Sequence, residues 1–247
     1  MGVPGVADRL RRHPGLLEPV VVIVALFGGH LAVVAAVQGA GGVTPLDAGV
    51  HAWFVEHRSA LLDPVMIGVS AVGGTAGMAA LAILTAAVLV RWGHRAQAVI
   101  VLIACAGGEA LGDVAKLIYQ RTRPPQADWL GVVTSYSLPS GHALLATVTV
   151  GIVAAVVVHP CPSRSVRTGV AALAIGVVLL IGTSRLYLGV HWPTDVVTGY
   201  LLGGAWLAVC VLGLTVVEPQ RAPDGTDAPT VPLRWSRGRR AQRISSR

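Results

Sequence analysis

Long apolar runs that are almost free of charged residues dominate this 247-residue chain. Six of them cover residues 20–37, 65–90, 96–118, 143–158, 169–189 and 196–217. A helix needs roughly 17–25 apolar residues to cross a bilayer, so each run predicts one membrane span. The composition, 53% hydrophobic and only 13% charged, excludes an ordinary soluble domain. We therefore predict an all-α, polytopic membrane protein with six transmembrane helices in a bundle. The fourth and fifth runs have short apolar cores, so we expect their outer ends at the depth of the lipid headgroups.

The distribution of basic residues predicts which helix ends face the cytoplasm, because cytoplasmic segments of membrane proteins are enriched in Lys and Arg. With the N-terminus inside, 14 of the 19 Lys and Arg residues lie in cytoplasmic segments. The five others are Arg58, Lys116, Arg121, Arg123 and Arg185. We therefore expect a multi-pass protein of a bacterial-type plasma membrane, with both termini in the cytoplasm and the polar motifs described below on the outer face.

The terminal segments are expected to lie outside the membrane domain. We assign residues 1–19 to a cytoplasmic N-terminal segment, 20–217 to the membrane domain and 218–247 to a disordered basic cytoplasmic tail, which lacks any apolar period. The net charge of +7 could suggest nucleic acid as a partner, but seven of the positive charges lie in the last 27 residues. Attraction of such a tail to anionic inner-leaflet lipid explains them better than nucleic acid does. Cleavage of the first run as a signal peptide is an alternative, although its 18 residues are long for that purpose.

Residues 41–63, between the first two runs, predict a further helix on the outer side. Leu46, Val50, Trp53 and Phe54 follow helical spacing. This helix either lies in the membrane interface, with Trp53 among the aromatic residues at headgroup level, or packs over the bundle as an ordinary exterior helix. The sequence leaves both interpretations open.

A lysine and an arginine near the end of the third run form the first polar motif. Lys116 and Arg123 are seven residues apart, close to two helical turns, so both side chains can face the same side. Pro124 and Pro125 stop any helix there. A lone lysine at this depth often only extends its ammonium group to the headgroups. Arg123, with Arg121 two residues earlier, instead favours a cluster that binds an oxyanion.

The second motif, Pro139-Ser140-Gly141-His142, opens the fourth run. Serine is a strong N-cap residue, and glycine lets the backbone approach a ligand closely. The free N–H groups and the dipole of a helix start favour an anion. Taken alone, this tetrapeptide is equally compatible with a plain helix cap that carries an interfacial histidine.

The third motif precedes the sixth run and contains Ser184, Arg185, His191 and Asp195. Pro193 suits the first helical turn, so His191 lies just before the helix and Asp195 can reach back to it. A carboxylate on one imidazole nitrogen fixes the tautomer and leaves the other nitrogen free as a nucleophile. By itself, such a pair is more often a capping interaction.

Taken together, the segments KLIYQRTRP, PSGH and SRLYLGVHWPTD resemble the three-part signature of the type 2 phosphatidic acid phosphatase superfamily, which also includes vanadium haloperoxidases and glucose-6-phosphatase-like enzymes. Every expected signature position is filled, and the six-helix layout extends the resemblance over about residues 20–217. Polar groups at the ends of membrane spans are costly to keep without a function, which is consistent with phosphate-ester chemistry at a lipid–water boundary.

The resemblance implies a role for each matched residue. His191 would be the nucleophile that forms a phosphohistidine intermediate, oriented by Asp195. His142 would protonate the leaving oxygen and then activate water. The phosphate ligands would be Lys116, Arg123, Arg185, Ser140 and the amide of Gly141. The resemblance implies neither a metal ion nor another cofactor.

The leading hypothesis is a metal-independent phosphatase that acts on a lipid phosphate partner, such as phosphatidic acid, phosphatidylglycerol phosphate or a polyprenyl diphosphate like undecaprenyl diphosphate. A phosphotransferase on the same scaffold and a non-catalytic lipid-phosphate binder or transporter are alternatives. A haloperoxidase fits less well, because those enzymes are soluble. The oligomeric state is not predicted.

Other polar residues within the spans are expected to have supporting roles. Asp113, three residues before Lys116, is interpreted as orienting that lysine, with pairing to another helix as the alternative for both Asp113 and Glu109. His30 is interpreted as a hydrogen-bonded packing residue. Three cysteines lack disulfide or metal-ligand spacing and are interpreted as packing residues: Cys105, Cys161 and Cys210.

Overall fold

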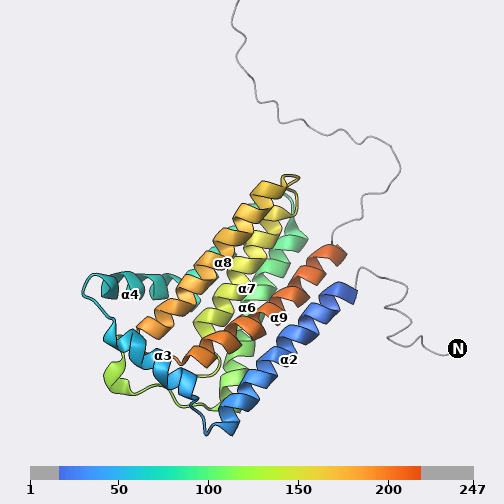
Figure 1. Ribbon diagram of the computed structural model, residues 1–247. Coiled ribbons are helices and arrows are strands. Elements are labelled where there is room, and N and C mark those ends of the chain that lie inside the picture. The colour runs from blue at the N-terminus through green and yellow to red at the C-terminus, as the bar shows by residue number, and fades with distance from the viewer. Residues whose placement is uncertain (1–16, 218–247) are drawn as a thin grey trace, which may run out of the picture.

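The computed structural model describes residues 17–217, and every regular element among them is helical (Figure 1). The helices are α2 (Leu17–Gly39), α3 (Pro45–Glu56), α4 (Leu62–Val72), α5 (Thr75–Arg91), α6 (Arg95–Tyr119), η2 (Gln126–Asp128), α7 (Gly141–Val158), α8 (Arg164–Tyr187) and α9 (Pro193–Val217). Five of them, α2, α6, α7, α8 and α9, are long and apolar enough to cross a membrane, and α4 with α5 can supply a sixth span. The predicted all-α, multi-span architecture is confirmed. The predicted basic tail and most of the predicted N-terminal segment lie outside the described residues.

The second predicted span is broken. The sequence predicts one continuous helix over residues 65–90, but α4 and α5 meet there at a bend of 50°, so that prediction is wrong. Gly73 and Gly74 form the break, as expected for a sharp kink. A Cβ atom on Gly73 would lie 2.5 Å from the side chain of Ile181 in α8, so this close approach requires a glycine. As a result α4 runs at an angle to the other helices (Figure 1).

Small residues let α7 and α9 pack closely at the centre of the bundle. A Cβ atom on Gly199 would lie 2.7 Å from the carbonyl oxygen of Ser140, and one on Gly203 would lie 2.8 Å from that of Leu144. Such contacts are a common way to join membrane helices, where apolar burial alone gives little association. The backbone N–H of Ser140 also donates to the carbonyl oxygen of Asp195 at 2.9 Å. These contacts fix the starts of α7 and α9 side by side.

The polar motifs all lie at one end of the bundle. The end of α6, the start of α7, the end of α8 and the start of α9 meet there, and α3 lies across them (Figure 1). The first residue of α2 and the last residue of α9 lie at the opposite end (Figure 1). This arrangement places every motif on the same side of a membrane.

The predicted exterior helix is α3. Thr44 and Asp47 form a capping box at its start, which explains why the helix begins at Pro45. Asp47 is buried against the bundle, whereas Leu46 is 64% exposed and Trp53 is 53% exposed. The helix therefore packs over the bundle, as one of the two alternatives predicts, and presents Leu46 and Trp53 outward; its place in the membrane interface stays a prediction.

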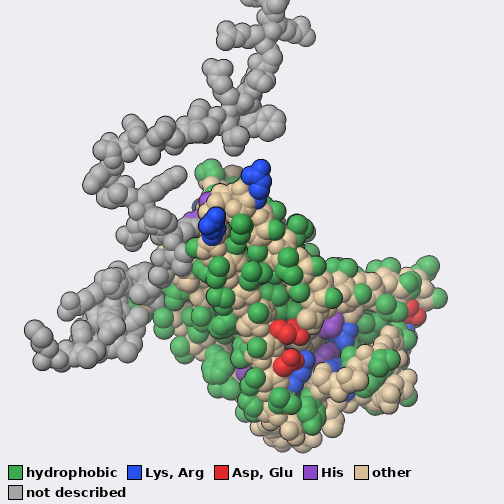
Figure 2. All heavy atoms as spheres, turned by 180° about the vertical axis from the view of Figure 1, so that it is seen from behind, with side chains coloured by type: hydrophobic (Ala, Val, Ile, Leu, Met, Phe, Trp, Pro, Cys, Tyr) green, Lys and Arg blue, Asp and Glu red, His purple; other side chains and the backbone are tan. Residues whose placement is uncertain are grey.

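Apolar side chains cover much of the outside of the bundle in the view of Figure 2. On α8, for example, Leu173 is 70% exposed and Ile175 is 60% exposed. Exposed apolar surface of this extent is typical of a surface that contacts lipid chains rather than water.

Candidate active site

A polar pocket of about 280 Å³ lies where the three motifs meet. The motif residues that line it are Lys116, Arg123, Gly141, His142, Arg185 and His191. Figure 2 shows basic, acidic and histidine side chains gathered beside a hollow on an otherwise largely apolar surface. The sequence thus predicted six of the residues that surround this pocket, from three segments far apart along the chain.

His191 and Asp195 form a buried pair at the start of α9. The Nδ1 atom of His191 lies 3.3 Å from Oδ2 of Asp195, and its Nε2 atom lies 3.1 Å from Nη1 of Arg123. A guanidinium group can only donate, so Nε2 must carry the lone pair and Nδ1 the proton. The imidazole is therefore held in the tautomer in which Nε2 is available as a nucleophile.

The surroundings of His191 keep its imidazole uncharged. Burial and the nearby guanidinium groups of Arg123 and Arg185 lower the pKa of His191 to about 3, although the hydrogen bond to Asp195 acts in the opposite direction. At neutral pH the Nε2 lone pair is thus not blocked by a proton.

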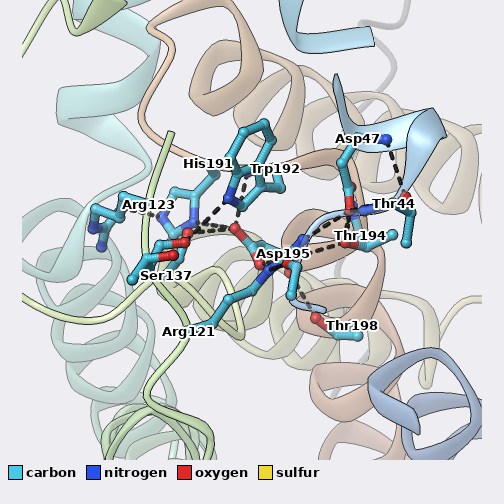
Figure 3. A network of polar contacts seen from close by, with 12 residues as sticks. Thr44, Asp47, Arg121, Arg123, Ser137, His191, Trp192, Thr194, Asp195 and Thr198 are labelled. Carbon is cyan, nitrogen blue, oxygen red and sulfur yellow. Dashed lines mark hydrogen bonds and ion pairs between the residues drawn. The ribbon is translucent and has the colours of Figure 1, made fainter. Parts of the chain in front are cut away.

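Asp195 is a centre of hydrogen bonding behind His191 (Figure 3). Its Oδ2 atom accepts from the backbone N–H of Trp192 at 2.9 Å and from the hydroxyl of Ser137. Its Oδ1 atom accepts from Nη1 of Arg121 at 2.5 Å. The carboxylate is fully buried, so these donors fix its position and satisfy its lone pairs. Asp195 therefore does not line the pocket but orients the residue that does.

Arg121 occupies a different place from the one that the sequence suggests. Its guanidinium group lies between Asp47 and Asp195, with Nη2 2.7 Å from Oδ2 of Asp47. The Nε atom donates to the carbonyl oxygen of Gly42 at 2.7 Å. Its donors are thus directed at the protein, and the expectation that Arg121 joins the oxyanion-binding cluster is wrong.

Arg123 is held rigidly at the pocket wall. Its Nε atom donates to the carbonyl oxygen of Ser135 at 2.7 Å and its Nη1 atom to that of Val190 at 2.6 Å. Burial lowers the pKa of Arg123 to about 10, with Asp195 acting in the opposite direction, so the group stays cationic at neutral pH. A fixed cation of this kind is suited to stabilising charge that develops during a reaction.

The other two predicted cations reach the pocket from α6 and α8. The Nζ atom of Lys116 lies 3.4 Å from Oδ1 of Asp113, which is the contact expected if Asp113 orients this lysine. A Cβ atom on Gly141 would lie 3.1 Å from the same Nζ atom, so the glycine gives this ammonium group room. Arg185 donates from Nη1 to the hydroxyl of Ser70.

Two buried polar atoms of the predicted phosphate ligands have no hydrogen-bond partner: Nε of Arg185 and Oγ of Ser140. Ser140 caps α7 through its extended backbone, without a side-chain bond to the helix. Buried donors without partners are rare in folded proteins and call for an explanation such as a ligand. An oxyanion in this region would supply the missing acceptors.

His142 lies in the first turn of α7, two residues after Ser140. Its imidazole hydrogen-bonds to the backbone of Ser70, and its Nε2 atom would be 3.3 Å from a Cβ atom on Gly74. The break between α4 and α5 thus brings the backbone to His142. His142 and Arg185 also line a second pocket of about 390 Å³ beside the first.

Three serines at the site lie outside the motifs and were not predicted. Ser137 binds Asp195, Ser135 holds Arg123, and Ser70 binds Arg185. Glu109, for which pairing with another helix was one expectation, lines the polar pocket and accepts a hydrogen bond from the hydroxyl of Thr75 in α5 at 2.9 Å. Single serines and threonines near a motif give no distinct signal, so only the structure identifies them.

His30 is buried away from the pocket, in line with its predicted packing role. Its Nδ1 atom lies 3.2 Å from the carbonyl oxygen of Thr198, and its Nε2 atom lies 3.0 Å from the hydroxyl of Tyr119. Both ring nitrogens therefore have protein partners.

Comparisons with known proteins agree with the architecture. The family model described as PAP2 superfamily matches residues 97–216. Phosphatidylglycerophosphatase B of Bacillus subtilis is 30% identical over 181 residues, which is 73% of this chain and 88% of that protein. An undecaprenyl-diphosphatase of Sulfolobus acidocaldarius is 37% identical over 103 residues, 40% of this chain and 45% of that protein.

A solved structure has the same fold. The crystal structure of a transmembrane PAP2 type phosphatidylglycerolphosphate phosphatase from Bacillus subtilis superimposes with a TM-score of 0.73 at 27% identity, covering 81% of this chain and 98% of that one. With its helical bundle, its three motifs in one pocket and these relatives, the chain is a multi-span membrane protein that belongs to the PAP2 superfamily of phosphatases.

Proposed function

We propose that this protein hydrolyses a lipid phosphate through a phosphohistidine intermediate on His191, without a metal ion. The observation that carries this proposal is the position of His191. Its Nε2 atom bears the lone pair and lies 3.1 Å from Arg123, in a pocket that Lys116 and Arg185 also line. A phosphate held by these cations would present its phosphorus atom to Nε2.

The reaction then follows in two steps. In the first, Nε2 of His191 attacks phosphorus, the bond from phosphorus to the lipid oxygen breaks, and His142 gives that oxygen a proton. In the second, His142 takes a proton from water, the water oxygen attacks phosphorus, and the bond from phosphorus to Nε2 breaks. The products are a lipid alcohol and inorganic phosphate, and both histidines return to their starting states.

Three fixed cations can take the place that a metal ion has in many phosphoryl-transfer enzymes. Such reactions depend mainly on positioning and on stabilising charge on the equatorial phosphate oxygens. Lys116, Arg123 and Arg185 line the pocket, and the start of α7 adds the N–H groups of a helix end. Within residues 17–217 no three His, Cys, Asp or Glu side chains are grouped so as to hold a metal ion.

An apolar groove between α5 and α6 gives the lipid tail a place. It has a volume of about 320 Å³ and shares Thr75 and Glu109 with the polar pocket. Its other lining residues are apolar: Ala79, Ala82, Ile83, Leu102, Cys105, Ala106 and Leu145. A phosphate in the pocket could therefore stay attached to a tail that lies among the helices.

The acidic residues beside the cations favour one class of lipid phosphate. Glu109 and Asp113 line the same pocket as the three cations. Their carboxylates would repel the second phosphate of a diphosphate, whereas they can accept hydrogen bonds from hydroxyl groups. We therefore place a phosphate monoester on a hydroxyl-bearing headgroup, such as phosphatidylglycerol phosphate, ahead of a polyprenyl diphosphate. The greater coverage of phosphatidylglycerophosphatase B supports this order.

Phosphate release by the purified full-length protein tests the proposed function. Phosphatidylglycerol phosphate, phosphatidic acid and undecaprenyl diphosphate are offered separately in detergent, with and without EDTA and with vanadate. We expect release of inorganic phosphate that EDTA leaves unchanged and vanadate blocks, because the cations can hold a five-coordinate oxyanion. Loss of activity in EDTA that Mg²⁺ or Zn²⁺ restores would contradict metal independence. Transfer of phosphate to an added alcohol in place of release would identify a phosphotransferase.

We further propose that the pocket faces the outside of the cell. The arginine distribution favours this orientation, and Gln126 and Ser165 provide the test because they lie in the loop on the motif side and at the far end of α8, respectively. Both side chains are exposed. In a background without native cysteines, an impermeant thiol reagent added to intact cells is expected to label Gln126→Cys and to miss Ser165→Cys. Permeabilised cells, in which both should react, are the control, and the opposite pattern would place the site in the cytoplasm.

A further inference from the structure

A chain of buried charges links α3 to the histidine pair. Asp47 of α3 binds Nη2 of Arg121 at 2.7 Å, and Nη1 of the same guanidinium binds Asp195 at 2.5 Å. Asp47 and Asp195 are fully buried, and Arg121 is 6% exposed. Figure 3 shows the three side chains in sequence, with His191 beyond Asp195. None of the motifs includes Asp47.

Stability alone is a weak reason for such an arrangement. Removing charged groups from water is costly, and apolar side chains of similar volume often stabilise a fold as well as a buried ion pair does. Two carboxylates here share one guanidinium, so the cluster keeps a net negative charge. Burial acts to raise the pKa of Asp47, but hydrogen bonds from Thr194, Thr44 and Arg121 outweigh it and lower the pKa. Asp47 is thus ionised, and its hydrogen bonds to Arg121 and Thr194 fix the position of its carboxylate.

Asp47 also fixes the backbone that carries Asp195. Its Oδ1 atom accepts from the backbone N–H of Thr194 at 3.0 Å and from the hydroxyl of Thr194 at 2.8 Å. Thr194 lies in the first turn of α9, where backbone N–H groups have no partner within the helix. Asp47 therefore caps α9 from a different helix, one residue before Asp195.

We propose that Asp47 is a positioning residue for catalysis, which acts through Arg121 and Thr194 to hold Asp195 against Nδ1 of His191. The inference rests on the proposed role of His191 as nucleophile. Asp47 touches neither the pocket nor the substrate, so its loss should slow the chemical step and leave substrate binding unchanged. A misoriented nucleophile lowers kcat, whereas the cations that bind phosphate stay in place.

The test compares two Asp→Asn variants of the purified full-length protein. Asp47→Asn keeps the shape of the side chain but turns an N–H₂ group or a neutral oxygen towards Arg121. Asp128→Asn is the matched control, because Asp128 also anchors α3, through His51 at 3.0 Å, and its side chain contacts His51 rather than Arg121, Thr194 or Asp195. We expect Asp47→Asn to lose at least about tenfold in kcat with KM unchanged within about twofold, and Asp128→Asn to keep both within about twofold.

Two further variants separate positioning from folding. Asp47→Glu restores the charge and is expected to recover part of the lost kcat. A lysine at position 121 cannot span both carboxylates as the forked guanidinium does, so Arg121→Lys is expected to lose kcat in the same way as Asp47→Asn. It therefore replaces Asp47→Asn as the test if that variant does not fold. All rates are expressed per folded protein, judged by size-exclusion chromatography and thermal melting.

The outcomes distinguish this inference from the proposed function. If Asp47→Asn and Arg121→Lys match Asp128→Asn in kcat, or if they raise KM alone, Asp47 has no positioning role. That result leaves the phosphatase proposal intact. Absence of turnover in the wild-type protein, or full turnover without His191, would overturn both.

Discussion

Replacing His191 with Ala is expected to abolish turnover of a lipid phosphate while inorganic phosphate still binds. The imidazole supplies the only nucleophile that we assign, whereas Lys116, Arg123 and Arg185 hold the anion from other elements. A loss of at least about 10³-fold in kcat, roughly 4 kcal/mol in the barrier, is the expected size. Steady-state kinetics measures the loss of turnover, and isothermal titration calorimetry with inorganic phosphate measures binding to the variant.

His57→Ala is a suitable control for this experiment. His57 lies at the end of α3, on the same side of the bundle, and is exposed. Its ring stacks on Trp53, and its Nδ1 atom lies 2.7 Å from the carbonyl oxygen of the same residue. Its replacement should leave kcat unchanged. Retention of more than about a tenth of the wild-type kcat in His191→Ala would exclude His191 as the nucleophile.

Replacing His142 with Gln is expected to produce a loss that depends on the leaving group. A general acid contributes about 10²–10⁴-fold where the leaving group is a poor one, as the alkoxide of a lipid is. An aryl phosphate with an acidic phenol needs no such proton, so its first step should proceed in the variant. The second step still lacks the base that activates water, and a phosphohistidine should therefore accumulate on His191.

The accumulated intermediate is the decisive measurement. Protein incubated with radiolabelled aryl phosphate should retain label that is stable in base and lost in acid, as expected for a phosphorus–nitrogen bond. The lipid substrate should leave no label, because its first step is slow in the variant. Equal losses for both substrates, with no retained label, would contradict the double role of His142.

The sequence was sufficient for those features that depend on neighbouring residues. Apolar run length predicted the spans, and the capping residues Ser140 and Pro193 predicted where α7 and α9 begin. The motifs predicted the residues of the polar pocket because cations, histidines and a helix start are distinctive together. The positions of Asp113 and His30 also matched their predicted contacts.

Features that depend on distant contacts were not predictable in this way. Gly73 and Gly74 stand in an apolar run that reads as one span, and the close approach of Ile181, which leaves no room for a Cβ atom at position 73, comes from a helix far away in sequence. Arg121 is two residues from Arg123, so proximity suggested a shared role. Its partners Asp47 and Asp195 are each 74 residues away in sequence, and nothing in a local pattern indicates that both bind it.

The buried charge chain has a consequence for biogenesis. Of the three parts of this cluster, α3 is synthesised first, Arg121 next and α9 last. Asp47 and the residue that it caps, Thr194, are 147 residues apart, so Asp47 is made long before its partner. Until α9 is inserted, Arg121 lacks one of its two carboxylates and the start of α9 is not there to be capped. Asp47 and Arg121 thus belong to an incomplete charge cluster until the start of α9 has been made. The pair of His191 and Asp195 therefore cannot form before the start of α9 is made, so a chain that stalls before the last span holds the cations but lacks the carboxylate that orients His191.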